Sequence, residues 1–151
     1  MSPAAKCFGT TAVAEAAPDL GVTVAIPGAG AAAGPFDLRF FGGNHAEIHS
    51  SIPIIDNVGV LVNRSFFYGG DALEPPGVAV ETLAVPTSGP WLKMGEMMDY
   101  VLAVEPNRTF GVHDLLNSDF GNNMAGSRLA WSVEQSGGTH LGFEVGQTAE
   151  I

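Results

Sequence analysis

Apolar and polar residues recur with different periods along the chain, and these periods predict both strands and helices. Residues 36–41 alternate at their start, as expected of a half-buried strand, and β-branched side chains dominate residues 22–26. Residues 59–62 and 65–68 flank the dipeptide Asn63-Arg64, which fits the tight turn of a β-hairpin because Asn tolerates a left-handed backbone. The first half of the chain is therefore predicted to contain several short strands.

The second half combines helices with further strands. The clearest helix spans about residues 90–104, where Met94, Met97, Met98 and Val101 recur at helical spacing. The other expected elements are a helix over 3–17 capped by Ser2, an exposed loop over 28–35, strands over 80–85, 109–112 and 140–145, and a helix over 124–135. Alternation of strands and helices favours a layered α/β (α+β) fold.

Size and charge restrict the classes of protein to consider. A chain of 151 residues is the size of one domain, and 46% hydrophobic residues are enough for a packed core. The 16 acidic residues outnumber the 6 basic ones, which gives a net charge of −10. Such a surface repels phosphate backbones and anionic lipids, so we expect neither nucleic acid nor a membrane as a partner.

Cysteine content and hydropathy address the compartment and the possible metal ligands. A single cysteine, Cys7, excludes an internal disulfide and any multi-cysteine metal site. The most apolar stretch, residues 22–33, is interrupted by proline and glycine, and the chain starts without the pattern of a secretory signal. The sequence therefore predicts a cytoplasmic protein in which histidine and carboxylate side chains are the available metal ligands.

Three residues of metal-ligating type directly follow predicted strands. They are His45, Asp71 and His113, and glycine pairs precede the first two closely. Side chains at strand ends are held more rigidly than those within loops, and glycine allows close approach of the backbone. Each residue also has an ordinary interpretation: a solvated histidine, or an aspartate that binds its own turn. From the residues alone, a metal site and a structural role both remain open.

A longer series of segments, in order and with conserved spacing, carries a family resemblance from about residue 20 onward. The segments are 40–49 (FFGGNHAEIH), 52–53 (IP), 57–62 (NVGVLV), 68–73 (YGGDAL), 83–86 (LAVP), 90–93 (PWLK) and 112–114 (VHD). With these segments the chain resembles the metallo-β-lactamase-fold hydrolases, in the branch similar to the ascorbate-6-phosphate lactonases. The resemblance implies an αββα sandwich, with a mixed sheet, flanking helices and one or two metals, usually zinc, at the strand ends.

The resemblance also implies roles for individual residues. His45 would bind the first metal, Asp71 would bridge both metals as the catalytic carboxylate, and His113 would bind the second. His49 would be a pocket or second-shell residue. Asp114 would either orient His113 or cap a helix at the following leucines.

The chain departs from the family in one large respect. The His-x-His-x-Asp-His motif of the family lies before the matched region, and this sequence has no histidine before His45. We therefore expect residues 1–151 to form one truncated domain that lacks the N-terminal part of the fold. Each metal would receive two protein ligands, whereas a catalytic zinc usually has three. The chain alone is thus not expected to be an efficient hydrolase.

Truncation predicts a partner and leaves two functions open. Loss of part of a sandwich exposes apolar surface, for example over residues 58–68, so we expect a homodimer or higher homo-oligomer. One function is metal-dependent hydrolysis of a lactone or ester of a small-molecule substrate, completed by another chain. The alternative is a non-catalytic relative with a structural or small-ligand-binding role.

Overall fold

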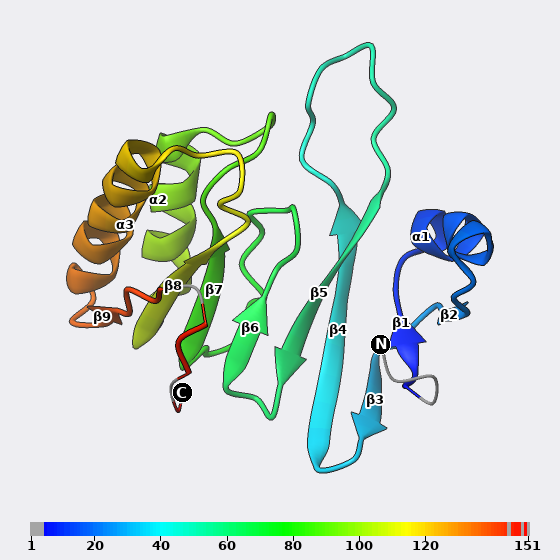
Figure 1. The fold of residues 1–151 in the computed structure, drawn as a ribbon. Helices are drawn as coiled ribbons and strands as arrows, with labels where there is room; N and C mark the ends of the chain where they lie inside the picture. Colours follow the sequence, from blue (N-terminus) through cyan, green and yellow to red (C-terminus); the bar gives the residue numbers. More distant parts are fainter. Residues whose placement is uncertain (1–4, 145, 149, 151) are drawn as a thin grey trace.

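The computed structural model describes residues 5–144, 146–148 and 150, which form a small and a large β-sheet with helices on both sides (Figure 1). The strands are β1 (Cys7–Phe8), β2 (Val24–Ala25), β3 (Gly30–Ala33), β4 (Phe36–Asn44), β5 (Asp56–Val62), β6 (Phe66–Tyr68), β7 (Thr82–Pro86), β8 (Arg108–Val112) and β9 (Thr139–His140). The helices are α1 (Thr11–Ala16), the 3₁₀ helix η1 (Ala17–Leu20), α2 (Met94–Val104) and α3 (Asp119–Glu134).

The large sheet has seven strands in the order in which they occur along the chain, from β3 to β9. The pairs β3–β4, β4–β5 and β5–β6 are antiparallel, whereas β6, β7, β8 and β9 are parallel to one another. Helix α2 connects β7 to β8, and α3 connects β8 to β9, as parallel strands require a crossover connection. The result is a mixed sheet whose parallel half carries the two long helices.

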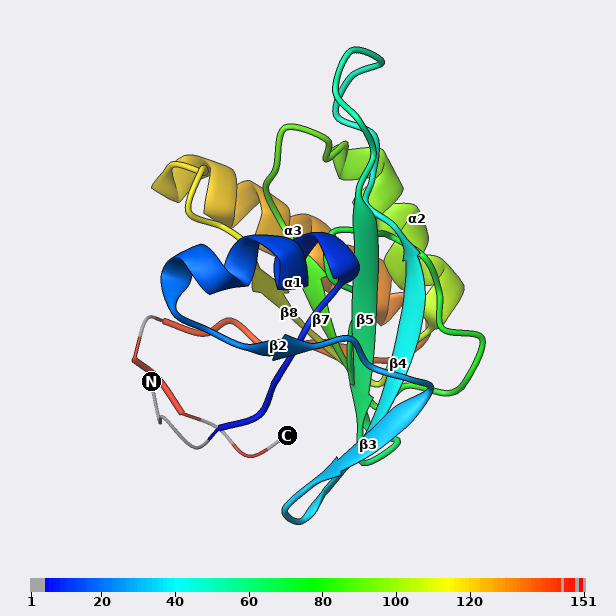
Figure 2. The same cartoon turned by 90° about the vertical axis from the view of Figure 1, so that its right-hand side faces the viewer.

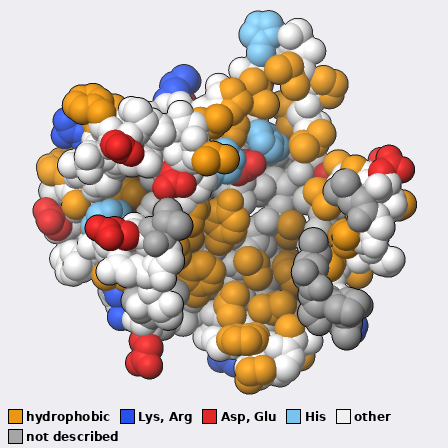
Figure 3. All heavy atoms as spheres, viewed as in Figure 1, with side chains coloured by type: hydrophobic (Ala, Val, Ile, Leu, Met, Phe, Trp, Pro, Cys, Tyr) orange, Lys and Arg blue, Asp and Glu red, His pale blue; other side chains and the backbone are white. Residues whose placement is uncertain are grey.

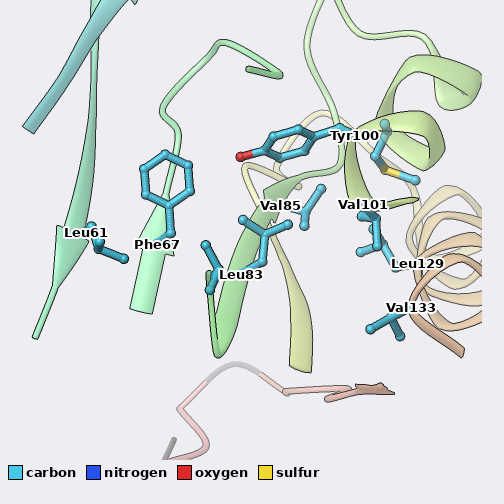
Figure 4. Close-up of a cluster of buried hydrophobic side chains, with 10 residues drawn as sticks. Leu61, Phe67, Leu83, Val85, Tyr100, Val101, Leu129 and Val133 are labelled. Atoms are coloured by element: carbon cyan, nitrogen blue, oxygen red, sulfur yellow. The ribbon is translucent and has the colours of Figure 1, made fainter. Parts of the chain in front are cut away.

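The hydrophobic core lies between the large sheet and helices α2 and α3 (Figure 4). Leu61, Phe67 and Leu83 occupy adjacent positions on β5, β6 and β7, and all three are at most 1% exposed. Strand residues on either side of each point to the opposite face, because side chains alternate along a strand. The helices contribute Tyr100 and Val101 from α2 and Leu129 and Val133 from α3.

The opposite face of the sheet carries aromatic side chains and is covered less completely. Phe66 stacks on Phe110, and Phe110 contacts Phe143 edge to face. Phe8 of the small sheet packs on Phe40, so the N-terminal segment covers the β4 end of this face. Figure 2 shows α1 on the side of the sheet away from α2, and Figure 3 shows hydrophobic side chains gathered in the centre of this face.

Several predicted elements are confirmed. The hairpin turns at Asn63 and Arg64, whose φ angles are 51° and 57°, as a two-residue turn with a left-handed backbone requires. Helix α2 ends at the predicted residue, with Met97 and Val101 fully buried. The predicted layered α/β class is also what the structure has.

The predicted N-terminal helix over 3–17 is wrong in its first part. Residues Cys7–Phe8 form β1, which pairs with β2, and helix α1 begins only at Thr11. Thr10 is the cap, because its side chain accepts a hydrogen bond from the Val13 amide. Pairing with a distant strand outweighs the helix propensity of this alanine-rich segment; Ser2, the predicted cap, lies outside the described residues.

Three further expectations are corrected. The segment 28–35 is not simply a loop, because Gly30–Ala33 forms β3 and pairs with β4 around a turn at Gly34. The leucines after Asp114 do not start a helix: α3 begins at Asp119 and is capped by Ser118. Of the C-terminal strand expected over 140–145, the described residues 140–144 contain only His140, which belongs to β9 (Thr139–His140). Among the described residues, no helix is long and apolar enough to cross a membrane.

Truncation of a core side chain tests this packing. Leu83→Ala removes a side chain that is 0% exposed, and we expect it to lower the free energy of unfolding by about 2–5 kcal/mol. Leu116→Ala is the matched control, because Leu116 is 70% exposed and its loss should change stability by no more than about 0.5 kcal/mol. Urea unfolding followed by circular dichroism measures both, and equal effects would contradict the described core.

Candidate metal centre

Strand direction brings the predicted ligands to one edge of the large sheet. β5 is antiparallel to β4 and to β6, so β4 runs in the same direction as β6, β7 and β8. His45 follows β4, Asp71 follows β6 and His113 follows β8. All three side chains therefore come from the carboxyl ends of strands, which meet at one edge where open α/β sheets commonly bind ligands.

The Asp71 carboxylate lies between the two histidines. His45 Nε2 is 3.3 Å from Asp71 Oδ2, and His113 Nε2 is 3.8 Å from Asp71 Oδ1. Each histidine thus faces a different oxygen of the same carboxylate. The three side chains are 17%, 36% and 28% exposed for His45, His113 and Asp71, so the cluster is shielded yet reachable from solvent.

The orientation of the His45 ring has a direct chemical consequence. Its Nδ1 is 2.6 Å from the Ala46 carbonyl oxygen, which can only accept, so Nδ1 carries a hydrogen. In a neutral imidazole the other nitrogen, Nε2, then presents a lone pair to the Asp71 carboxylate. Two acceptor atoms thus face each other, and either a proton or a metal ion between them would join them. A backbone carbonyl that fixes the tautomer in this way is typical of histidine ligands.

Asp71 is held by a glycine turn and by an asparagine of β5. Gly70 has φ of 69°, a conformation that favours glycine. Asn57 Nδ2 donates to the Gly69 carbonyl at 2.8 Å, and its Oδ1 accepts from the Asp71 amide at 3.0 Å. The Ala46 amide donates to the Asp71 carbonyl at 3.0 Å, so the backbones that carry His45 and Asp71 are directly connected.

His113 lies in a left-handed backbone conformation at the end of β8. Its φ is 55°, which is unusual for a residue with a side chain. Ser88 Oγ donates a hydrogen bond to the His113 carbonyl, and the Thr87 amide donates to the Val112 carbonyl at 2.9 Å. The β7 end therefore holds the β8 end in the conformation that turns the imidazole toward Asp71.

Trp91 forms an aromatic wall beside both histidines. Its ring lies 5.8 Å from that of His45 and 6.4 Å from that of His113, in edge-to-face arrangements. The side chain is only 7% exposed, so it is part of the packed interior. It restricts the histidine rings and limits solvent on one side of the cluster.

The negative charge of Asp71 acts on a neighbouring group of β6. Burial raises the pKa of Tyr68 above its ordinary value, and the Asp71 carboxylate raises this pKa further. A second tyrosine, Tyr100, has its hydroxyl fully buried, and burial raises its pKa strongly. Both phenols are therefore neutral around pH 7.

The other two predicted site residues lie away from the carboxylate. His49 is exposed in the loop between β4 and β5, where its Nδ1 contacts Ser51 Oγ at 2.7 Å. Asp114 is exposed, and its carbonyl accepts from the Asn117 amide. Within the described part of the chain, no hydrogen bond joins its carboxylate to His113.

His45, Asp71 and His113 are residues of the types that bind metals, but they are too few to form a complete metal centre. Ligand atoms about 2.0–2.1 Å from a tetrahedral zinc lie about 3.3–3.4 Å from each other, close to the His45–Asp71 separation of 3.3 Å. A charge-assisted hydrogen bond between the same atoms would measure about 2.7–2.9 Å. Nevertheless, in the described ranges no three His, Cys, Asp or Glu side chains form a group that could hold a metal ion by itself.

Sequence reasoning missed the residues that position the ligands. Asn57 and Ser88 act through hydrogen bonds to the backbone of turns that lie 12 and 25 residues further along the chain. Asn57 belongs to the segment that carried the family resemblance, which was the available signal for it. Nothing in the local pattern around Ser88 marked it as a support of His113.

Solved structures with the same arrangement of elements come from metalloproteins. Igni18, a metallo hydrolase from the archaeon Ignicoccus hospitalis, superposes with a TM-score of 0.67 over 96% of this chain and 68% of its own, at 12% identity. CmlA, a diiron β-hydroxylase from Streptomyces venezuelae, superposes with a TM-score of 0.60 over 85% of this chain and 35% of its own, at 13% identity. The chain has a metallo-β-lactamase-like fold. At identities of 12% and 13%, the similarity shows the fold of this chain and not its activity.

A curated relative matches part of this chain. Protein Rv0786c from Mycobacterium tuberculosis is 42% identical over 84 residues, which are 52% of this chain and 40% of the relative. The chain thus spans about two fifths of the length of that protein. No family model matches the sequence.

A glycine substitution tests the support of Asp71. In Gly70→Ala the new methyl group would overlap Asn57 Oδ1, so both hydrogen bonds of Asn57 should weaken. Gly77→Ala is the matched control, because Gly77 has a similar φ of 66° but open space around it. We expect the control to lose about 1–2 kcal/mol of stability from backbone strain, and Gly70→Ala to lose about 1–3 kcal/mol more. Equal losses in urea unfolding would contradict the described role of Asn57.

Proposed function

We propose that this chain supplies His45, Asp71 and His113 to a divalent-metal centre that hydrolyses an ester or lactone bond of a small molecule. The observation that carries the proposal is the contact of His45 Nε2 with the Asp71 carboxylate while Nδ1 is bonded to the Ala46 carbonyl. This arrangement places a nitrogen and an oxygen donor 3.3 Å apart. The metallo hydrolase and diiron enzyme folds of the structural neighbours support the choice of a metal over a proton.

The roles of the residues follow from their positions. His45 would hold one metal and His113 a second, since they face different oxygens of Asp71, which would bridge the two. Zinc suits imidazole and carboxylate donors. A bound zinc supplies Lewis-acid chemistry and a water of lowered pKa. Trp91 would exclude water from one side of the histidines, and Asn57 would keep the Asp71 turn in place through its hydrogen bond with the Asp71 amide.

The number of donors requires a further contribution. Two histidines and one shared carboxylate give each metal two protein donors, one fewer than a catalytic zinc usually has. We propose that a second copy of the chain completes the site within a homo-oligomer. The incompletely covered sheet face, with Phe66 and Phe110 stacked on it, is the surface that such an association would bury.

A non-catalytic, structural or small-ligand-binding role is the second candidate. The observation that favours it is that each metal would have only two protein donors, because a weakly held metal is a poor catalyst. The two functions differ in whether metal-dependent turnover accompanies metal uptake.

Metal uptake tests the centre directly. Chelator-treated protein is dialysed against buffered Zn²⁺, and bound zinc is measured per chain by mass spectrometry. We expect the wild type to take up zinc. His45→Ala and Asp71→Asn should each weaken the apparent affinity for zinc at least about tenfold, because each removes a donor. His49→Ala, only four residues from His45 but outside the cluster, is the matched control and should bind zinc as the wild type does.

The uptake result and two further measurements separate the outcomes. Absence of uptake by the wild type, or equal uptake by all variants, would overturn the centre. Sedimentation velocity with and without zinc shows whether a second copy is needed, and zinc bound by a monomer would refute completion in trans. Hydrolysis of 4-nitrophenyl esters that is lost with a chelator supports the enzyme over the binding role.

A further inference from the structure

The loop between β4 and β5, residues 45–55, carries an unusual concentration of exposed apolar side chains. It extends beyond the carboxyl edge of the sheet as a long excursion (Figure 1). Ile48, Ile52, Ile54 and Ile55 are 39–53% exposed. Its base is closed by the hydrogen bond from the His45 amide to the Ile55 carbonyl at 2.9 Å, and a turn links Ile52 to His49. Burying such side chains is favourable by about 25 cal/mol per Å² of apolar surface.

These isoleucines line a small cavity, open to solvent, next to the candidate metal centre. The cavity has a volume of about 150 Å³ and is lined by His45, Ala46, Pro53 and the four isoleucines. The lining includes no lysine, arginine, aspartate or glutamate, so a charged ligand group would lose its hydration there without compensation. A cavity of about this volume with aliphatic walls holds a group of the size of benzene.

His45 connects this cavity to the carboxylate. Its Nε2 faces Asp71, Trp91 packs against its ring edge to face, and the same residue forms the polar wall of the cavity. A ligand group bound among the isoleucines would therefore be separated from the Asp71 carboxylate only by the His45 side chain. Figure 3 shows this arrangement on the surface, with hydrophobic side chains above and histidine beside an acidic side chain at the foot of the loop.

We propose that this isoleucine pocket binds the apolar part of the substrate, a phenyl ring or an alkyl group of about six carbon atoms. The bond to be hydrolysed would then lie on the His45 side, toward Asp71. The substrate class is accordingly an ester or lactone with a compact apolar substituent rather than a phosphorylated or otherwise highly charged one. This inference rests on the proposed function for its reaction, whereas the pocket itself can be tested without a metal.

The isoleucine content of the chain makes a direct binding experiment possible. The chain has six isoleucines: the four of the pocket, Ile26 and Ile151. Protein labelled at the isoleucine δ1 methyl groups is titrated, in chelator, with benzyl alcohol, a neutral probe of suitable size. We expect saturable shifts of the methyl signals of Ile48, Ile52, Ile54 and Ile55. Ile26, which is 60% exposed and does not line the pocket, is the internal control and should not shift.

A pair of variants gives a second readout. Ile52→Asn places an amide in the pocket wall and should weaken binding of the probe at least about tenfold, whereas Ile26→Asn changes an equally apolar exposed site elsewhere and should not. Since both isoleucines are about half-exposed, neither variant should unfold the protein. Absence of saturable shifts, or equal shifts at Ile26, would overturn the pocket. An oligomer that Ile52→Asn dissociates would also overturn it, because a second copy would then be the occupant.

The pocket and the metal centre can fail separately. Probe binding that persists in Asp71→Asn together with absent zinc uptake would keep the pocket and reject hydrolysis by this centre. Zinc uptake without probe binding would keep the proposed function and reject the substrate class. In a zinc-loaded, active preparation, the substrate class predicts that kcat/KM is higher for 4-nitrophenyl hexanoate than for the acetate, and that Ile52→Asn removes this difference.

Discussion

β5 runs antiparallel to both of its neighbours, and this reversal brings His45 to the edge of the sheet that carries Asp71 and His113. With one intervening strand of opposite direction, β4 ends at the same edge as β6, β7 and β8. Without it, His45 would lie at the far end of a seven-residue strand from Asp71, a separation of roughly 20 Å. The Ala46–Asp71 backbone hydrogen bond, the wall formed by Trp91 and the position of the isoleucine loop above the cluster all follow from that common edge.

The elements that could be predicted are those whose signals are local. The Asn63-Arg64 turn depends on two residues, and α2 depends on the spacing of a few methionines and a valine. The approximate ends of β4, β6 and β8 were also visible in the sequence, which sufficed to place three candidate ligands after strands. That these residues converge on one carboxylate follows from strand order and direction, which the sequence pattern alone does not contain.

What the sequence could not show depends on contacts between distant segments. The alanine-rich start of the chain has the composition of a helix, yet Cys7–Phe8 pairs with β2 and Phe8 packs on Phe40. The Gly/Ala segment before β4 becomes a strand because β4 offers it a partner. Likewise, the tautomer of His45 is set by a carbonyl of the next residue, and the turn of Asp71 by an asparagine on β5. None of these contacts produces a periodic pattern in the sequence.

At His113, the residue that would be best for local stability differs from the residue that could bind a metal, because the backbone there is left-handed. A residue other than glycine in this conformation costs about 1–2 kcal/mol, which the hydrogen bonds from Ser88 and Thr87 to this turn help to offset. Glycine or asparagine would relieve that cost, and a search for thermostable variants would favour either at this position. Both would also delete the imidazole that faces Asp71. The residue that relaxes the backbone best is thus one that a functional lineage would have to reject.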